Sequence, residues 1–485
     1  MKRYIIVVLS LLFLGTVSAQ TLYDGVEFSN KNLNGTARFV GMGGAMGALG
    51  GDISTIGTNP AGIGIYRSND VMTSFSFSSH EIETKYDDNK FTNNRNRGNF
   101  DNFGIVFSNN MGKYNTLRFV NFAFNYNRAK TFYKTREMGG QFTGTLLDQM
   151  LYQANGAYDS FKYDYLKEIK GKTPGLFDHP DVGWLSALGY EGLLIRPIEG
   201  GGGYDTAWDN APLGSFYSKE WGGINQYDFN LSFNLIDRIY LGLSIGAYDL
   251  EYKKYSYYGE LIFYPGEVES IDGYEVHTTK WIDGAGFDFK FGLIARPFED
   301  SPFRLGLAFH TPTYYKLTLE TEADLLSDIH RNGELVESNV YSGNIRSDFR
   351  LRTPWKLNFS LGHTIGTQLA LGAEYEYQDN TNLKFKYREG EGSMTTLNNM
   401  VNDLSKGVHT LRLGAEYNVI PEFAFRIGYN YSTSSYKKEA FKELGYNAVE
   451  TDADYANSED LHRITLGIGY RGRSFYTDLA YQYNH

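Results

Sequence analysis

Apolar and polar residues alternate with a period of two along most of the chain after Val71. Between Tyr227 and Leu235, every odd position is apolar and every even position is polar. The same alternation continues through residues 120–127, 239–245, 411–418, 423–431 and 464–470. A period of two puts apolar side chains on one face of a β-strand and polar side chains on the other. The pattern therefore predicts an all-β chain.

This alternation predicts thirteen strands, at 71–80, 100–109, 117–128, 224–235, 239–252, 281–296, 303–318, 345–363, 368–380, 407–419, 423–435, 460–471 and 474–485. Short and long connections alternate along the chain. The short ones lie near 110–116, 236–238, 297–302, 364–367, 420–422 and 472–473, and the long ones near 81–99, 129–223, 253–280, 319–344, 381–406 and 436–459. Short turns at one end and long loops at the other are typical of an outer-membrane β-barrel, whereas a soluble β-sandwich has no reason to segregate its loops. The apolar faces also have the roughly 9–12 residues that a tilted strand needs to cross a bilayer.

The number of strands leads to a further expectation. Single-chain bacterial barrels have an even number of strands, and an open sheet edge is not tolerated in lipid. Either one strand escapes the pattern, or the sequence stops short of the natural C-terminus after Tyr483-Asn484-His485. We favour a missing fourteenth strand at the C-terminal end, and so expect a barrel of about 14 strands.

The first residues have the pattern of a cleaved signal peptide. Lys2 and Arg3 precede an apolar stretch, and Val17-Ser18-Ala19 offers small residues for cleavage before Gln20. Residues 1–19 are therefore predicted to direct export to the outer membrane of a Gram-negative cell. Gln rather than Cys at position 20 argues against a lipoprotein.

Composition narrows the classes of protein that remain. Aromatic residues make up 16% of the chain, which suits strands that meet lipid and interfacial water. A mean hydropathy of −0.41 argues against a bundle of membrane helices. The absence of cysteine excludes disulfides and thiolate chemistry. Loss of two positive charges with the signal peptide takes the formal net charge from −11 to −13, so we expect no nucleic-acid partner.

The longest predicted connection, 129–223, contains apolar residues that are not arranged as strands. Leu146, Leu147, Met150 and Leu151 are spaced for one face of a short helix, and residues 159–169 suggest a second. Further along the connection lie Trp184, Leu185, Leu188, Leu193 and Leu194. These five residues either pack the loop onto the barrel rim or form a surface that contacts ligand; large apolar content requires a burial partner in both cases.

Charged residues on the polar strand faces include Glu374, Glu376, Arg412, Glu416, Arg426 and Arg463. We expect them to line the lumen and to pair with one another, as charged residues inside barrels do. Carboxylate pairs also serve acid–base catalysis, but no nucleophile–base arrangement accompanies them. The nine histidines form no close pair or metal-binding motif. We therefore predict no catalytic site, no metal and no cofactor.

A Gly- and Ala-rich stretch lies just before the first strand. Residues 35–52 read GTARFVGMGGAMGALGGD and lead into Asn59-Pro60-Ala61-Gly62. This combination resembles the N-terminal hatch of the FadL/TodX family, and the likeness extends into the barrel at Thr353-Pro354-Trp355-Lys356. The branch it resembles most is the Bacteroidetes-type one, often labelled as haemin receptors.

The resemblance implies a division into a plug, 20–70, and a barrel, 71–485, with Asn59, Pro60 and Gly62 as the plug motif. It implies passive uptake of hydrophobic compounds such as long-chain fatty acids, with outer-membrane lipid as surroundings and the barrel assembly machinery as a partner during biogenesis. Two alternatives remain: a surface protein-interaction or shuttle role in type IX secretion, and a haemin receptor.

Overall fold

The computed structural model describes residues 20–86, 88–156, 164–206, 213–263, 271–331, 333–388 and 392–485. The predicted signal peptide and residues 159–163 of the predicted second loop helix lie outside these ranges. One antiparallel sheet contains 17 strands. They are β1 (Asp70–Tyr86), β2 (Asn89–Asn110), β3 (Leu117–Thr131), β4 (Lys134–Gln141), β7 (Leu213–Leu235), β8 (Ile239–Phe263), β9 (Ile271–Ala295), β10 (Arg304–His310), β11 (Tyr314–Arg331), β12 (Glu334–Arg352), β13 (Lys356–Ile365), β14 (Leu369–Asp379), β15 (Lys384–Tyr387), β16 (Gly407–Ile420), β17 (Phe423–Ser432), β18 (Leu461–Arg471) and β19 (Tyr476–Asn484).

Four pairs of these strands are single paths through the sheet that are interrupted by a short break. The pairs are β3 with β4, β10 with β11, β12 with β13, and β14 with β15. Pro312 and Pro354 stand in two of the breaks, where a residue without an N–H group cannot continue the ladder. The 17 strands thus follow thirteen paths, at the predicted positions, and a fourteenth stays a prediction.

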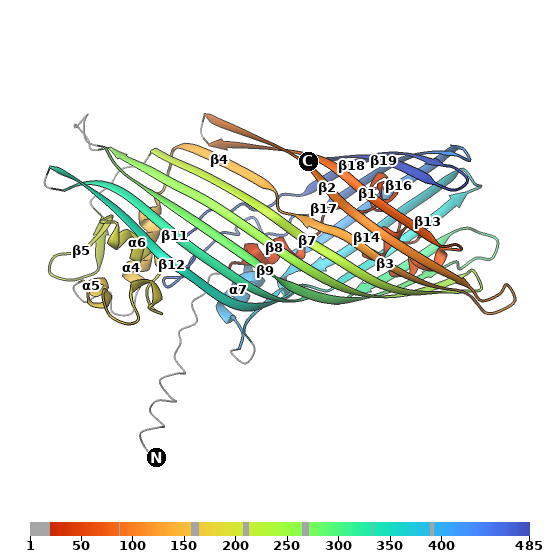
Figure 1. Ribbon diagram of the computed structural model, residues 1–485, viewed down its shortest axis with the longest axis horizontal. Coiled ribbons are helices and arrows are strands. Elements are labelled where there is room, and N and C mark those ends of the chain that lie inside the picture. Colours follow the sequence, from red (N-terminus) through yellow and green to blue (C-terminus); the bar gives the residue numbers. More distant parts are fainter. Residues whose placement is uncertain are drawn as a thin grey trace, which may run out of the picture.

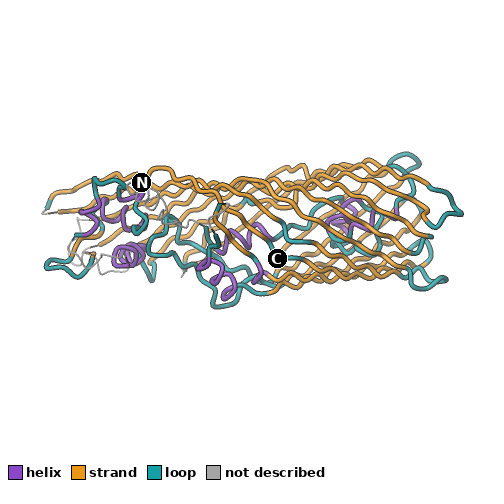
Figure 2. Tube along the Cα trace, turned by 90° about the horizontal axis from the view of Figure 1, so that it is seen from below, coloured by secondary structure: helices purple, strands orange, loops and turns teal. Residues whose placement is uncertain are grey.

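Backbone pairing continues strand by strand from β1 through β2, β3, β7 and β8 and onward to β19. The Tyr476 hydroxyl of β19 donates to the Asp70 carboxylate of β1 at 3.1 Å, so the first and last strands lie beside each other. The strands surround an interior that contains short helices and loops (Figure 2). Plug residues such as Met42 and Ala45 lie against glycines on the inner side of the sheet.

The sheet is apolar outside and polar inside. On β8, Leu241, Leu243 and Ile245 are 38–53% exposed, whereas Ser244 between them is 3% exposed. The apolar face continues over neighbouring strands through Phe229, Phe289, Phe291, Leu307, Phe359, Leu413, Ile427 and Leu466. Buried inner positions include Asp228, Asn234, Lys290, Asn358 and Thr465. An apolar band of this size facing outward is typical of a sheet surrounded by lipid.

Several strands are much longer than the alternation indicates. β8 and β9 each have 25 residues, and β7 has 23. The predictions of long connections over 81–99, 253–280 and 319–344 are wrong for most of those residues, which form strand hairpins. Beyond the apolar band both faces of a strand can be polar, so alternation no longer marks the strand. Figure 1 shows β7, β8, β9, β11 and β12 extending together toward the long-loop end.

Helices occupy two regions. α2 (Leu22–Ser29), α3 (Ala37–Gly41), η1 (Ile53–Gly57) and η2 (Pro60–Ile65) belong to the N-terminal segment. α4 (Leu146–Gly156), α5 (Tyr165–Ile169), η3 (Leu176–Asp178) and α6 (Trp184–Glu191) lie at the long-loop end with the small sheet of β5 (Ile195–Pro197) and β6 (Tyr204–Thr206) (Figure 1). η4 (Asn380–Asn382) and α7 (Thr395–Leu404) lie between β14 and β16. None of the described helices is long and apolar enough to cross a bilayer.

Candidate functional site: the plug and the lumen cavity

The Asn59-Pro60 turn joins the N-terminal segment to the inner wall of the sheet. Asn59 is fully buried, and its Nδ2 donates to the Leu293 carbonyl of β9 at 3.1 Å. The Pro60 carbonyl accepts hydrogen bonds from Asn230 Nδ2 at 3.2 Å and Ser232 Oγ at 3.0 Å, both on β7. Pro60 begins η2, where its fixed φ suits the first helical position. The turn thus provides hydrogen-bond partners for a backbone carbonyl of the wall, that of Leu293, and for one of the plug, that of Pro60.

Gly62 has its contacts inside the plug. A Cβ atom added there would lie 2.4 Å from Thr55 Oγ1, so only glycine lets η2 pack this closely on η1. The Gly62 carbonyl also accepts a hydrogen bond from Gly51 N at 3.0 Å.

A ring of wall glycines brings the plug backbone against the sheet. We call Gly242, Gly292, Gly372, Gly414 and Gly428 the glycine girdle. In the register Gly242 pairs with Gly292, and Gly414 pairs with both Gly372 and Gly428. An added Cβ would lie 2.0 Å from Ala45 O at Gly372 and 2.4 Å from Met42 O at Gly414. No larger residue fits the present spacing between wall and plug.

Charged wall residues hold the plug through direct contacts. Glu374 accepts a hydrogen bond from Gly47 N at 3.0 Å and pairs with Arg412 at 2.5 Å. Glu416 binds the plug residue Arg38 at 2.8 Å.

The charged residues predicted to line the lumen all belong to β14, β16, β17 and β18. Arg426 Nε lies 2.6 Å from Glu416 Oε2, and Arg412 Nη2 lies 3.1 Å from Glu376 Oε2. Arg463 stands apart from these carboxylate pairs. The structure therefore brings five of the six together in ion pairs.

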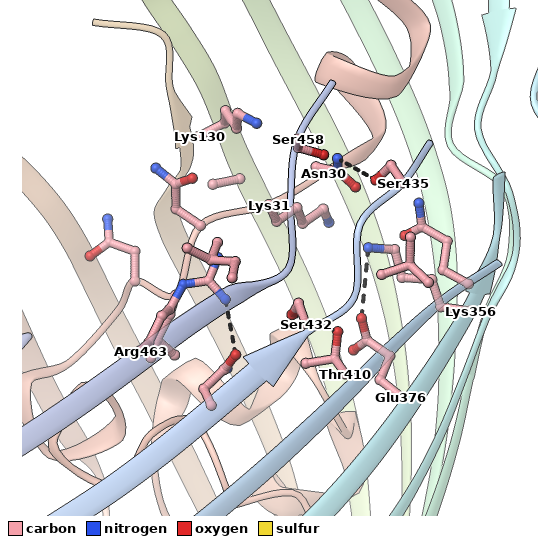
Figure 3. Close-up of a pocket in the computed structure, with 18 of the residues that line it drawn as sticks. Asn30, Lys31, Lys130, Lys356, Glu376, Thr410, Ser432, Ser435, Ser458 and Arg463 are labelled. Atoms are coloured by element: carbon pink, nitrogen blue, oxygen red, sulfur yellow. Dashed lines mark hydrogen bonds and ion pairs between the residues drawn. The ribbon is translucent and has the colours of Figure 1, made fainter. Parts of the chain in front are cut away.

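A cavity of about 420 Å³ lies between the plug and the wall. Plug residues 30–34 form one side, and β16, β17 and β18 contribute Thr410, Ser432 and Arg463. Figure 3 shows these side chains around the cavity. Most of the side chains that Figure 3 labels are polar or charged, so the cavity differs from a purely apolar ligand pocket.

Lys31 is the plug cation in this cavity. Its Nζ donates to the Tyr248 hydroxyl at 2.8 Å and to Gln226 Oε1 at 3.0 Å. Burial lowers the pKa of Lys31 to about 7; Asp288 opposes this shift, and Lys290 adds to it. Sequence reasoning missed Lys31, because a lysine between two asparagines has the pattern of a solvated loop.

The N-terminal helix α2 is held above the cavity by buried ion pairs. Asp24 completes a capping box with the N-cap residue Thr21 and lies 3.3 Å from Lys280 of β9, which also pairs with Glu450. Burial raises the pKa of Glu27, but the Lys130 and Lys134 ammonium groups outweigh burial and lower it to about 2. These contacts join the plug to strands and to the 433–460 connection.

The apolar residues of the long connection pack inward. Trp184, Leu185, Leu188 and Leu194 are at most 2% exposed, and Leu193 adopts a positive φ of 62° after α6. These four side chains belong to a large apolar cluster with inner residues of β8, β9, β11 and β12, among them Leu325, whereas Leu193 is half-buried and outside this cluster. A ligand would reach these residues only from inside this cluster.

No cluster of three or more His, Asp and Glu side chains in the described ranges is placed to hold a metal ion. Ser244, in a Gly-x-Ser-x-Gly stretch, lies inside β8 rather than at a strand-to-helix turn, and its hydroxyl accepts a hydrogen bond from Asn230 Nδ2 at 2.8 Å.

Comparison with known proteins gives structural neighbours only. No family model and no curated protein matches the sequence. A FadL homologue of Pseudomonas aeruginosa is 12% identical, with 94% of this chain and 90% of that chain covered and a TM-score of 0.48. The monoaromatic hydrocarbon channel CymD is 10% identical, with 94% of each chain covered and a TM-score of 0.46. The toluene transporter TodX of P. putida is 12% identical, with 93% and 92% covered and a TM-score of 0.42. The names agree with the resemblance of the N-terminal motif, but at these TM-scores the likeness carries no argument about function.

Proposed function

We propose that this chain is an outer-membrane protein that takes up hydrophobic small molecules by passive diffusion. One observation carries the proposal: an outward-apolar sheet encloses an interior that the chain's own N-terminal segment fills. A lipid-facing wall with a plugged interior suits controlled passage better than an open pore.

Several features support the outer-membrane location. Leu413 and Ile427 are among the exposed apolar residues that would contact lipid. The predicted signal peptide would direct export, and the barrel assembly machinery would insert the sheet. The short-turn end would then face the periplasm, and the long-loop end would face outward.

The proposed route through the interior has two stages. The apolar cluster at the long-loop end, which includes Trp184 and Leu188, provides a dry region for an apolar ligand. The lumen cavity lies next to the plug, and passage beyond it requires plug residues such as Asn59 and Pro60 to move. Long-chain fatty acids are candidate ligands on this route.

Mass spectrometry of small molecules that stay with the purified protein tests the proposal, together with a visible absorption spectrum of the same sample. We expect a near-stoichiometric apolar molecule that is absent from a variant lacking residues 20–60. A haem absorption band or a co-purifying protein, without such a molecule, would replace uptake by one of the two alternatives.

A further inference from the structure

Three short turns lie side by side at the short-turn end of the sheet. They span 111–116, 236–238 and 296–303, and they join β2 to β3, β7 to β8 and β9 to β10. The Ile236 N–H donates to the Thr116 carbonyl at 2.8 Å, and the Arg296 N–H donates to the Arg238 carbonyl at 2.8 Å. Each turn is thus hydrogen-bonded to the next, and the three form one continuous surface.

Basic side chains outnumber acidic ones on this surface. We call Arg67, Arg118, Arg238, Arg296 and Arg304 the mouth arginines; they belong to these turns, to the strand ends beside them or to the segment that joins the plug to β1. With Lys113 they make six basic residues, against the acidic residues Asp237, Glu299 and Asp300. The surface is therefore positive in a chain whose formal net charge is −11.

Only two of the mouth arginines have carboxylate partners among the described residues. Arg67 pairs with Asp237 at 2.7 Å, and Arg238 lies 3.8 Å from Glu299, whose side chain is 84% exposed. An exposed pair at that distance contributes little to stability, so Arg238 remains available to another carboxylate.

Arg118, Arg296 and Arg304 form no ion pair within the described ranges. Arg296 donates to two backbone carbonyls, both at 3.5 Å, and Arg304 Nη1 donates to the Leu49 carbonyl of the plug at 2.6 Å. Arg118 is half-buried, and its side chain makes no hydrogen bond to another described residue. Three guanidinium groups thus lack a counter-ion, which is costly for partly buried cations.

The inner arginines face the mouth of the barrel rather than lipid. Strand alternation puts Arg296 on the same side as Ile294 and Arg304 on the same side as Gly306, and both of these residues are buried on the inner side of the sheet. Phospholipid head groups lie on the outer side of this wall. An anionic partner therefore has to approach from the aqueous space beyond the short turns.

The same turns expose large apolar side chains. Tyr114 is 92% exposed and Phe298 61%, while Met111 and Ile236 are 41% and 44% exposed. An interfacial girdle explains aromatic residues at strand ends, but Tyr114 and Phe298 lie within the turns themselves. Arginine, methionine and aromatic residues are the types enriched at the core of protein–protein interfaces. This combination favours a protein partner over a small anion or a glycan.

We infer that the mouth arginines and these three turns form a docking surface for an acidic segment of a periplasmic protein, with apolar residues among its carboxylates. Guanidinium groups bind carboxylates through paired N–H donors, and Tyr114 and Phe298 would pack against the apolar residues. The inference rests on the proposed outer-membrane location, which makes the short-turn end face the periplasm. A partner seated there would lie against the plug, because Arg304 contacts Leu49.

Binding of matched peptides to the full-length protein in lipid nanodiscs tests this inference. The peptides are repeats of Glu-Phe-Gly, of Lys-Phe-Gly and of Glu-Ser-Gly, all of one length. We expect the Glu-Phe-Gly peptide to bind more tightly than the other two. Arg118→Gln should weaken its binding about tenfold, because one hydrogen bond to a charged group contributes about 1.5–3 kcal/mol. Phe298→Ser should weaken it to a similar extent.

Control variants at the opposite end separate docking from general effects of charge and exposure. Arg346→Gln removes an arginine whose side chain is 67% exposed on β12, and Leu335→Ser removes an apolar side chain that is 51% exposed on the same strand. Both should bind the Glu-Phe-Gly peptide like wild type. Arg118→Lys keeps the charge and should recover part of the affinity, and circular dichroism verifies the β-structure of each variant.

Each other outcome decides against part of the inference. Equal binding of the glutamate and lysine peptides, or equal affinity of wild type and Arg118→Gln, would overturn the docking surface. Glu-Ser-Gly binding as tightly as Glu-Phe-Gly, or soluble peptidoglycan fragments displacing the peptide, would replace the protein partner by an anionic polymer. Failure of every peptide to bind, with an apolar molecule retained in the mass spectrum, would overturn docking and leave uptake standing. Peptide binding without a retained apolar molecule would leave docking standing and count against uptake.

Discussion

At the scale of single residues, the absence of a side chain in the glycine girdle matters as much as any contact. At Gly372 and Gly414, wall and plug backbones approach so closely that one methyl group would overlap a carbonyl oxygen. Backbone groups of the plug can therefore reach wall side chains such as Glu374. A wall of alanines would hold the plug further away and break these bonds.

Gly372→Ala tests this closeness. We expect the added methyl group to weaken plug docking by about 1–3 kcal/mol, the usual effect of overpacking, and to raise ion conductance in planar bilayers. Gly98→Ala is the matched control, because an added Cβ there meets nothing within 4 Å. Equal conductance of the two variants would show that the girdle does not hold the plug.

Lys31 gives a pH-dependent prediction. Its pKa is about 7 in the folded protein and about 10.5 in an unfolded chain, so the folded protein loses this proton first as pH rises. Stability then increases with pH between these two values, and the cost of desolvating the Lys31 ammonium is fully present below pH 7. Asp288, Asp228, Lys290 and Lys356 face the same ammonium.

Lys31→Met should therefore unfold at a higher temperature than wild type at pH 6, with the difference shrinking toward pH 10. Thermal unfolding followed by circular dichroism measures the two unfolding temperatures at each pH. Lys167→Met, which removes an exposed lysine on α5, should show no such trend. A constant difference across this range would contradict the depressed pKa.

Some of these residue positions and contacts could be predicted from the sequence. Gly242, Gly414 and Gly428 stand at polar positions of alternating strands, which predicts that they face inward. That Gly414 pairs with Gly428, and Gly242 with Gly292, follows only from strand register, which a single strand's pattern does not contain. The partners of Glu374 and Arg412 were predictable in kind, because lumen charges must pair. The surroundings of Arg463 and Lys31 could not be predicted, because it is the assembled wall and plug that leave both without an ion pair among the described residues.

At the scale of elements, the strands reach beyond the apolar band and carry a second layer of contacts. β7, β8 and β9 extend past it, and their inner faces meet α2 and the helices of the long connection. The sequence places these strands correctly but makes them too short at the long-loop end, because apolar alternation reports lipid contact rather than hydrogen bonding. α4 was predictable from the spacing of Leu146, Leu147 and Met150; its burial against distant strands was not.

The α2 helix depends on Lys280, which lies between Asp24 and Glu450. Lys280→Met should destabilise α2 docking by about 3–5 kcal/mol, because two buried carboxylates lose their cation. Amide hydrogen exchange of α2 measures this opening. Lys170→Met removes an exposed pair with Glu191, in which the lysine side chain is 56% exposed, and should change stability by at most about 1 kcal/mol. Similar exchange in both variants would mean that apolar packing alone holds α2.

At the scale of the whole molecule, wall and plug have separate sources of stability. The wall's strands satisfy one another through their ladder, and lipid covers their apolar face. The plug contributes contacts such as Asn59 with Leu293 and Gly47 with Glu374, which water in an open lumen could replace. The wall should therefore fold without the plug, whereas the plug has no sheet of its own.

Deletion of residues 20–60 tests whether wall and plug have separate sources of stability. We expect a protein that keeps its β-sheet signal by circular dichroism but raises the permeability of liposomes to small hydrophilic solutes by about an order of magnitude, since barrels of this size enclose aqueous channels once the lumen is empty. Deletion of Gly201 and Gly202 from the turn between β5 and β6 is the control, because that turn touches neither the wall glycines nor the cavity. A sealed barrel after the plug deletion would mean that inner wall side chains, Lys290 and Arg412 among them, close the lumen by themselves; the N-terminal segment would then be a ligand-handling element rather than a barrier.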